Sequence, residues 1–197
     1  MSLEFTYTLS DLGNNLRLLS VPLENSPSVT VAIFAGVGSR YERAELSGIS
    51  HVIEHMAFKG TTNRPNRKLI SNEIAALGGE GNAGTGYEFT YYYVKMPTYQ
   101  WEKALDIVSD LTLNPIYPEQ ELEKEKTVII QEYGMYEDNP HQKLLNDFRD
   151  FIWPDHPLGR KISGTPDTIS SFSKEQLDQF RTAYYTRNNL LIAISGG

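Results

Sequence analysis

Two histidines and a glutamate stand close together in the segment His51-Val52-Ile53-Glu54-His55. Residues four apart on an α-helix lie on the same face, so the two imidazoles can direct ring nitrogens at one point. Imidazole nitrogens bind zinc at about 2.0–2.1 Å. Glu54 falls on the same side of the helix, about 60° from His51, where it can act as a general base on a water beside such an ion. The spacing predicts a metal site with hydrolytic chemistry.

The rest of this segment supports a helix with two distinct faces. At 100° per residue, the apolar side chains fall on the side away from the histidines. Only Phe58 intrudes on the polar side. The alternative is a chance cluster on a helix surface, but the chain has only 4 histidines and two of them form this pair. The apolar positions are Ile49, Val52, Ile53, Met56 and Ala57.

A third ligand has to be a carboxylate or another histidine, because the chain has no cysteine. Glu125 and Glu132 lie seven residues apart on the apolar stripe of a predicted helix over 119–137. A buried carboxylate is costly unless it meets a cation or hydrogen-bond donors. One of the two is therefore expected to bind the metal and the other to support it, and the helical wheel does not choose between them. For Glu125, a buried salt bridge is the alternative. The stripe consists of Leu122, Val128, Ile129, Met135 and Tyr136.

The elements that must position these residues alternate between β-branched runs and helical patterns. Ser47 is predicted to cap a helix of about 12 residues that carries the pair, and Ser173 opens a later helix with a capping-box pattern. The mixture predicts an α+β fold in which helices cover a sheet. Strands are predicted at 5–8, 16–21, 29–34 and 190–195, with a strand pair or one bent strand over 82–96. Further helices are predicted at 67–77, 99–113, 142–151 and 173–184, with a loop at 156–168.

Composition narrows the class of protein. The 197 residues carry a formal charge of −7, which argues against nucleic acid and an anionic membrane surface as partners. No apolar stretch approaches the 18 or so residues that a membrane helix needs. The first residues lack the pattern of a signal peptide, so we expect a cytoplasmic protein. Without an obvious linker, residues 1–197 are expected to form a single domain.

Several segments together resemble the pitrilysin or insulinase family of zinc peptidases, which includes the mitochondrial processing peptidase and insulin-degrading enzyme. The resemblance runs from about Asn15 to the end of the chain. Its most specific parts are 48–61 around the histidine pair, 78–85 with Glu88, Thr90 and Tyr92, the glutamates Glu125 and Glu132 before 136–140, and the later 156–159, 164–165, Tyr185, Asn188 and Asn189.

The resemblance implies a zinc-dependent endopeptidase with one zinc ion per chain. In the family a glutamate about 76 residues beyond the motif is the third ligand, and 76 residues separate His55 from Glu132. The match therefore implies His51, His55 and Glu132 as ligands, Glu54 as the general base and Glu125 as a supporting residue. It also implies the family's fold, a mixed and largely antiparallel sheet covered by helices.

A peptide substrate is expected to lie along the strand that contains Asn82 and Ala83. An exposed edge strand can pair with an extended peptide, and the glycines around it would let a second backbone approach. The resemblance implies the same placement. The alternative is a glycine-rich turn that leads into an ordinary core strand.

The resemblance also implies a partner. In the family a homologous second half closes over the first and supplies an Arg and a Tyr, and no segment of this chain repeats its own first part. Without that half we expect zinc binding with little hydrolysis, and self-association through the exposed inner face. The alternative function is a non-catalytic zinc-containing scaffold or a peptide-binding module. His141 and His156 are not expected to be ligands.

Overall fold

A computed structural model of the chain describes residues 6–197, which form one six-stranded sheet and seven α-helices. The strand order is β1-β2-β6-β3-β5-β4, with β2 and β6 parallel and every other pair antiparallel. This is the α+β fold with a mixed, largely antiparallel sheet that the sequence predicts. The strands are β1 (Thr8–Asp11), β2 (Arg17–Pro22), β3 (Ser28–Ala35), β4 (Glu80–Thr85), β5 (Thr90–Pro97) and β6 (Leu190–Gly196).

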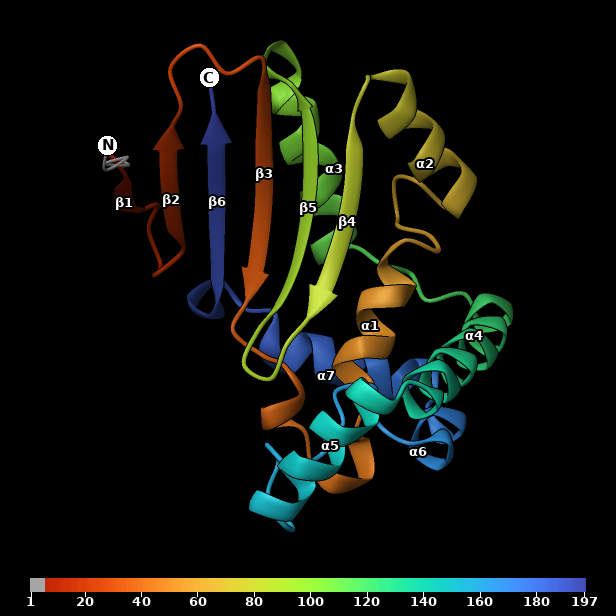
Figure 1. The fold of residues 1–197 in the computed structure, drawn as a ribbon. Coiled ribbons are helices and arrows are strands. Elements are labelled where there is room, and N and C mark those ends of the chain that lie inside the picture. Colours follow the sequence, from red (N-terminus) through yellow and green to blue (C-terminus); the bar gives the residue numbers. More distant parts are fainter. Residues whose placement is uncertain (1–5) are drawn as a thin grey trace.

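The helices divide between one face of the sheet and one end of it (Figure 1). Helices α2 and α3 lie against the face of β3, β5 and β4, whereas α4 to α7 gather below the sheet together with α1. The helices are α1 (Ile49–Ala57), α2 (Arg67–Ala76), α3 (Trp101–Leu113), α4 (Glu119–Asp138), α5 (Pro140–Ile152), α6 (Pro166–Ser171) and α7 (Lys174–Tyr184). None of the helices in the described range has the length and apolar character needed to cross a membrane.

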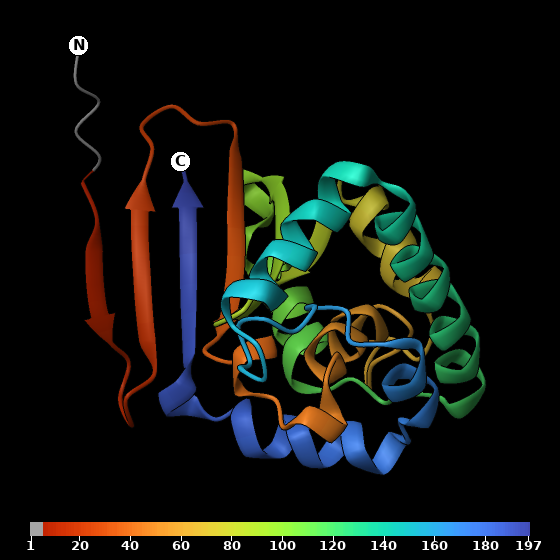
Figure 2. The same ribbon diagram turned by 60° about the horizontal axis from the view of Figure 1, so that its bottom comes forward.

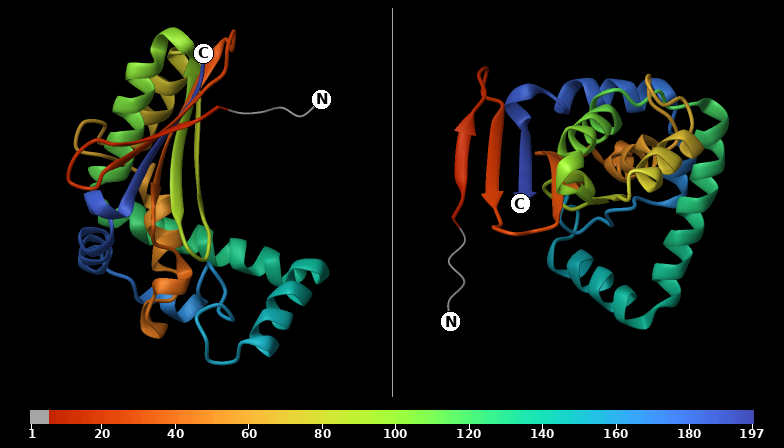
Figure 3. Two further views of the ribbon diagram at one scale, coloured as in Figure 1. Left: turned by 90° about the vertical axis from the view of Figure 1, so that its left-hand side faces the viewer. Right: turned by 90° about the horizontal axis from the view of Figure 1, so that it is seen from above.

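Strand β5 shows how the sheet separates its two faces. Tyr92 and Val94 point into the core and are almost fully buried, while the alternate residues Tyr91 and Tyr93 are only half-buried. Helix α3 packs on the buried side. In the left view of Figure 3, α4 and α5 extend past the sheet toward the side opposite to α3. The site residues on α4 therefore lie below the end of the sheet, where α4 contacts α1.

Helix α1 is enclosed by other elements. It contacts α4, α7 and the edge strand β4, and Figure 2 shows α4 and α7 bordering it. These contacts hold the histidine pair between the sheet edge and α4. The hydrophobic core under the pair includes Ile49, Val52, Ile53 and Met56, all at most 1% exposed.

Some predicted elements differ from the structure. The first strand is β1 at Thr8–Asp11 rather than 5–8, of which residue 5 lies outside the described range. Of the two alternatives predicted for 82–96, the structure has the strand pair, β4 and β5. Helix α6 overlaps the end of the predicted loop, and Thr165 caps it in a capping box whose second member is Thr168 rather than the usual Glu or Gln.

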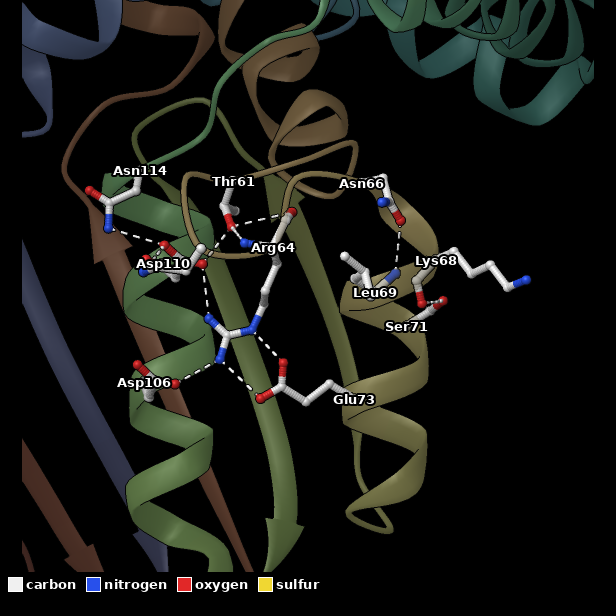
Figure 4. Close-up of polar contacts among 11 residues, drawn as sticks. Thr61, Arg64, Asn66, Lys68, Leu69, Ser71, Glu73, Asp106, Asp110 and Asn114 are labelled. Carbon is white, nitrogen blue, oxygen red and sulfur yellow. Dashed lines mark hydrogen bonds and ion pairs between the residues drawn. The ribbon is translucent and has the colours of Figure 1, made fainter.

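A buried arginine ties the α1–α2 loop to α3 (Figure 4). The Arg64 guanidinium donates to Glu73 (2.7 and 3.1 Å), Asp106 (2.7 Å) and Asp110 (2.9 Å). Asp110, which is 2% exposed, also accepts from Thr61 (2.5 Å) and from two asparagines. The loop that follows the histidine helix is thus anchored to two other helices.

Candidate metal centre

Helix α1 begins differently from the prediction. Ser47 is not its cap: the N-cap is Gly48, whose φ of 95° lies in the left-handed region that favours glycine. The carboxylate of Glu42 accepts the N–H groups of Gly48 (2.7 Å) and Ser50 (2.8 Å), so a distant side chain satisfies the helix start. Burial raises the pKa of Glu42, although these two donors oppose the shift.

Three ligand atoms converge where α1 crosses α4. His51 Nε2 and His55 Nε2 are 3.1 Å apart, and Glu132 Oε2 is 3.9 Å from the first and 3.6 Å from the second. Ligands at zinc distances in a tetrahedron lie about 3.3–3.4 Å from one another. Within the described residues, His51, His55 and Glu132 are the one group of this kind that could hold a metal ion. Their triangle has the size that a tetrahedral zinc ion requires.

The protonation state of the His51 imidazole suits metal binding. Burial and the neighbouring His55 lower the pKa of His51 to about 3, so its ring is neutral at neutral pH. A neutral imidazole offers the lone pair that a metal needs. The other ring nitrogen of His51, Nδ1, is buried without a hydrogen-bond partner.

Glu125 fixes the orientation of the second imidazole. Its Oε1 is 2.9 Å from His55 Nδ1, and its Oε2 is 2.5 Å from the Lys59 ammonium. Burial would raise the pKa of Glu125, but the bonds from His55 and Lys59 outweigh it and the pKa is lowered. An ionised Glu125 keeps the proton of His55 on Nδ1 and leaves Nε2 free to face the site.

The two glutamates of α4 thus differ in position. The Glu125 side chain is 8% exposed and the Glu132 side chain 29% exposed. Only Glu132 joins the group of candidate ligands, and the Tyr136 hydroxyl donates to its Oε1 at 2.9 Å. The predicted apolar stripe is wrong at three of its five positions, because Val128, Met135 and Tyr136 are 46%, 72% and 41% exposed.

Glu54 lies beside the ligand group and is held by a residue that sequence reasoning missed. Thr85, the last residue of β4, donates its hydroxyl proton to Glu54 Oε2 at 2.7 Å. Burial raises the pKa of the Glu54 carboxyl, while the Thr85 bond lowers it. Glu54 and His55 line two adjoining cavities of about 510 Å³ each, one toward the start of β4 and one toward its end.

Asn82 and Ala83 lie in β4, which is the edge strand of the sheet. The Ala83 N–H is bonded to the Asn82 side-chain oxygen at 2.9 Å, so this amide is not used by β5. An extended segment could take the place of that side chain. Gly84 packs closely on the ring of Tyr91, where a Cβ would lie 2.7 Å from ring atoms.

The other two histidines lie away from the site. His141 is exposed in the first turn of α5, where its backbone N–H bonds Asn139. His156 is exposed in the following loop, where its Nδ1 accepts the Leu158 N–H at 3.2 Å. In the described part of the chain neither belongs to a group that could hold a metal.

Comparison with known proteins assigns this chain to a family. The model of the insulinase family, peptidase family M16, matches residues 17–166. The chain belongs to this family. An uncharacterized zinc protease from Rickettsia felis is 40% identical over 190 residues, which are 96% of this chain and 46% of the relative. The uncharacterized zinc protease YmxG of Bacillus subtilis is 38% identical over 93% of this chain and 44% of its own length.

Solved structures agree with the family assignment. A protease from Helicobacter pylori superimposes with a TM-score of 0.90 at 28% identity, over 98% of this chain and 47% of that one. An M16-like peptidase from Alicyclobacillus acidocaldarius shares the fold with a TM-score of 0.87 over 100% of this chain. The chain therefore spans about half the length of the relatives it matches.

Proposed function

We propose that this chain is the metal-bearing part of a zinc-dependent endopeptidase. The observation that carries the proposal is the convergence of His51, His55 and Glu132 within 4.8 Å, with Glu54 at their side. Three protein ligands leave one coordination position open, which distinguishes a catalytic zinc site from a structural one. A bound zinc ion would polarise the carbonyl of the bond to be cleaved and acidify a water.

The residues of the chain supply the proton transfers and the binding surface. Glu54 takes a proton from the attacking water and passes it to the leaving amine. Thr85 orients one oxygen of Glu54 and leaves the other for this task. The substrate lies as an added strand along β4, where its main chain replaces the Asn82 side chain at the Ala83 N–H.

The test combines metal content with cleavage in the protein of full natural length. We expect one zinc ion per chain by elemental analysis, and cleavage of a quenched peptide library that a chelator abolishes and added zinc restores. Glu54→Gln should keep the zinc and lower turnover by about 10²–10⁴-fold, because an amide does not accept the proton. Unchanged turnover in this variant would remove Glu54 from the mechanism. Bound zinc without any turnover would instead favour a zinc-containing scaffold.

The missing half of the relatives' length motivates a second part of the proposal. We propose that a homologous second half covers the site and adds groups that bind the substrate from the other side. Positioning and electrostatic stabilisation are the main contributions that an open site would lack. Residues 1–197 alone should bind zinc but cleave peptides slowly, and adding the second half as a separate chain should restore turnover. Full activity from a monomer of residues 1–197 would contradict this part.

A further inference from the structure

The cavity at the end of β4 is lined by a cation that forms no ion pair with a carboxylate of residues 6–197. Arg149, on α5, lines this cavity together with His51, Glu54 and Glu132. Its guanidinium stacks over the Tyr87 ring at 5.5 Å and makes one weak bond to Asn146 at 3.4 Å. None of the ion pairs found among residues 6–197 includes Arg149.

The other charges of this cavity already have partners. Lys161 is bonded to Glu137 at 2.6 Å and to the Tyr133 hydroxyl at 2.8 Å, so its charge is neutralised within the chain. Glu132 belongs to the group of candidate ligands, and Glu54 accepts a hydrogen bond from Thr85. Facing the cavity from α5, Gln142 and Asn146 are neutral amides. The wall away from the metal ligands thus carries an unbalanced positive charge at Arg149.

The stack on Tyr87 holds this charge in a defined place. A guanidinium over an aromatic face is attracted to it and keeps its edges free for hydrogen bonds. Tyr87 follows Thr85 by two residues, and Thr85 is bonded to Glu54. Tyr87 lies in the turn after β4, and it lines the same cavity as Arg149, Glu54 and Glu132. Arg149 is therefore expected to face a substrate side chain close to the cleaved bond but not at it.

The direction of the substrate follows from the pairing geometry. Antiparallel strand pairs are slightly more stable than parallel ones, and β4 runs from Glu80 toward Thr85. A peptide antiparallel to β4 enters at the Thr85 end, so its residues on the N-terminal side of the cleaved bond lie near Tyr87 and Arg149.

We propose that Arg149 is a specificity-determining residue that selects an acidic side chain within three residues on the N-terminal side of the cleaved bond. A substrate Asp or Glu would form a bidentate pair with the planar guanidinium, which a Lys or Arg at that position would repel. This inference rests on the proposed function, since it assigns a substrate preference to the same site.

The experiment measures binding separately from cleavage. Zinc-loaded Glu54→Gln protein of full natural length is titrated with fluorescent ten-residue peptides that carry Glu, Gln or Lys at each position in turn. The register is mapped from the bond that the wild-type protein cleaves. At one of the three positions before that bond, Glu should bind about 5- to 10-fold more tightly than Lys, with Gln between them. High salt should reduce the difference.

Variants on α5 separate Arg149 from a general effect of charge. Added to Glu54→Gln, Arg149→Gln should bring the Glu-to-Lys binding ratio close to one, and Arg149→Glu should invert it. Lys143→Gln removes the same charge from the same helix, outside the cavity, and should leave the ratio unchanged. Arg149→Lys keeps the charge but not the planar fork, so it should retain only part of the preference.

The assignment of Arg149 and the proposed function can be contradicted separately. A Glu-to-Lys ratio near one at all three positions, or an equal loss in Lys143→Gln, would overturn the assignment of Arg149, as would an acid preference only after the cleaved bond. Those results would leave zinc-dependent cleavage intact. If the wild-type protein cleaves no peptide, the proposed function is wrong. The Glu-to-Lys binding ratio at every peptide position then still shows whether Arg149 selects an acidic side chain.

Discussion

Two clusters of polar groups lie close together in the sequence, one around His51 and His55 and one around Arg64. They differ in whether the protein itself balances their charges and hydrogen bonds. At Arg64, one guanidinium meets three carboxylates, and the most buried of these, Asp110, accepts from Thr61 as well (Figure 4). At the histidine pair, three acceptors converge on one another without a protein cation between them.

The difference separates a structural role from a chemical one. The Arg64 cluster is complete within the chain, so its groups have nothing left to offer a ligand. The His51, His55 and Glu132 cluster directs ring nitrogens and a carboxylate oxygen inward, and its partners Glu125 and Tyr136 bond only the other ring nitrogen of His55 and the other oxygen of Glu132. Acceptors in such an arrangement repel one another until a cation joins them. Burial of charge alone therefore does not mark a functional site, whereas incomplete satisfaction does.

The largest effect is expected when Arg64 is replaced by Met. The change leaves Asp110, at 2% exposure, without its cation, and breaking a buried pair in this way costs about 3–5 kcal/mol of unfolding free energy. Denaturant unfolding measures the loss, and Arg67→Met, an exposed arginine three residues later, should change stability by less than about 0.5 kcal/mol. Zinc affinity of the folded Arg64→Met protein should stay unchanged. If Arg64→Met kept its unfolding free energy but bound zinc more weakly, Arg64 would serve the metal site rather than stability.

Glu132→Gln should give the opposite pattern. Loss of a ligand is expected to lower zinc affinity by at least about 100-fold, more than the loss of a supporting residue. Stability of the metal-free protein should change little, because the Glu132 side chain is 29% exposed and, among the described residues, takes a side-chain hydrogen bond from Tyr136 alone. Competition with a chelator measures the affinity. Glu121→Gln on the same helix is the control, and full zinc occupancy in Glu132→Gln would show that the ligand assignment is wrong.

Glu125→Gln tests a residue that combines both roles, because Glu125 supports a candidate ligand and also forms an ion pair with Lys59. The amide oxygen can still accept from His55 Nδ1, but the charge is lost. Zinc affinity should fall by about 10-fold, at the low end for supporting residues. The same competition with a chelator measures the zinc affinity. An affinity equal to that of the unchanged protein would give Glu125 a role in folding alone.

Glu42 offers the smallest test, through the pH dependence of stability. Burial raises its pKa in the folded chain above the ordinary 4.5. The protonated form is thus favoured on folding, so its contribution is fully present below pH 4.5 and is lost as the pH rises through the raised value. The stability of the unchanged protein relative to Glu42→Gln should fall between pH 4 and pH 7. If the stability of the unchanged protein relative to Glu42→Gln instead rose over this range, the two backbone donors would outweigh burial in setting the pKa of Glu42.

Local spacing determined much of the candidate site. The placement of His51 and His55 on one side of α1, with Glu54 beside them, depends only on helical periodicity within five residues. The capping box at Ser173 is a local signal of the same kind and is present in the structure. Alternating residues and β-branched runs likewise predicted most strands, because the period of a strand is a local property.

Only the tertiary structure decided which distant groups complete the site. Glu125 meets His55 across 70 residues and Thr85 meets Glu54 across 31, and both contacts depend on how α4 and β4 pack against α1. Glu42 replaced the expected Ser47 cap for the same reason. A helical wheel placed Glu125 and Glu132 on one side of α4, but burial separated them, since α4 leaves the core after Ile129 and carries Glu132 to the half-open edge of the site.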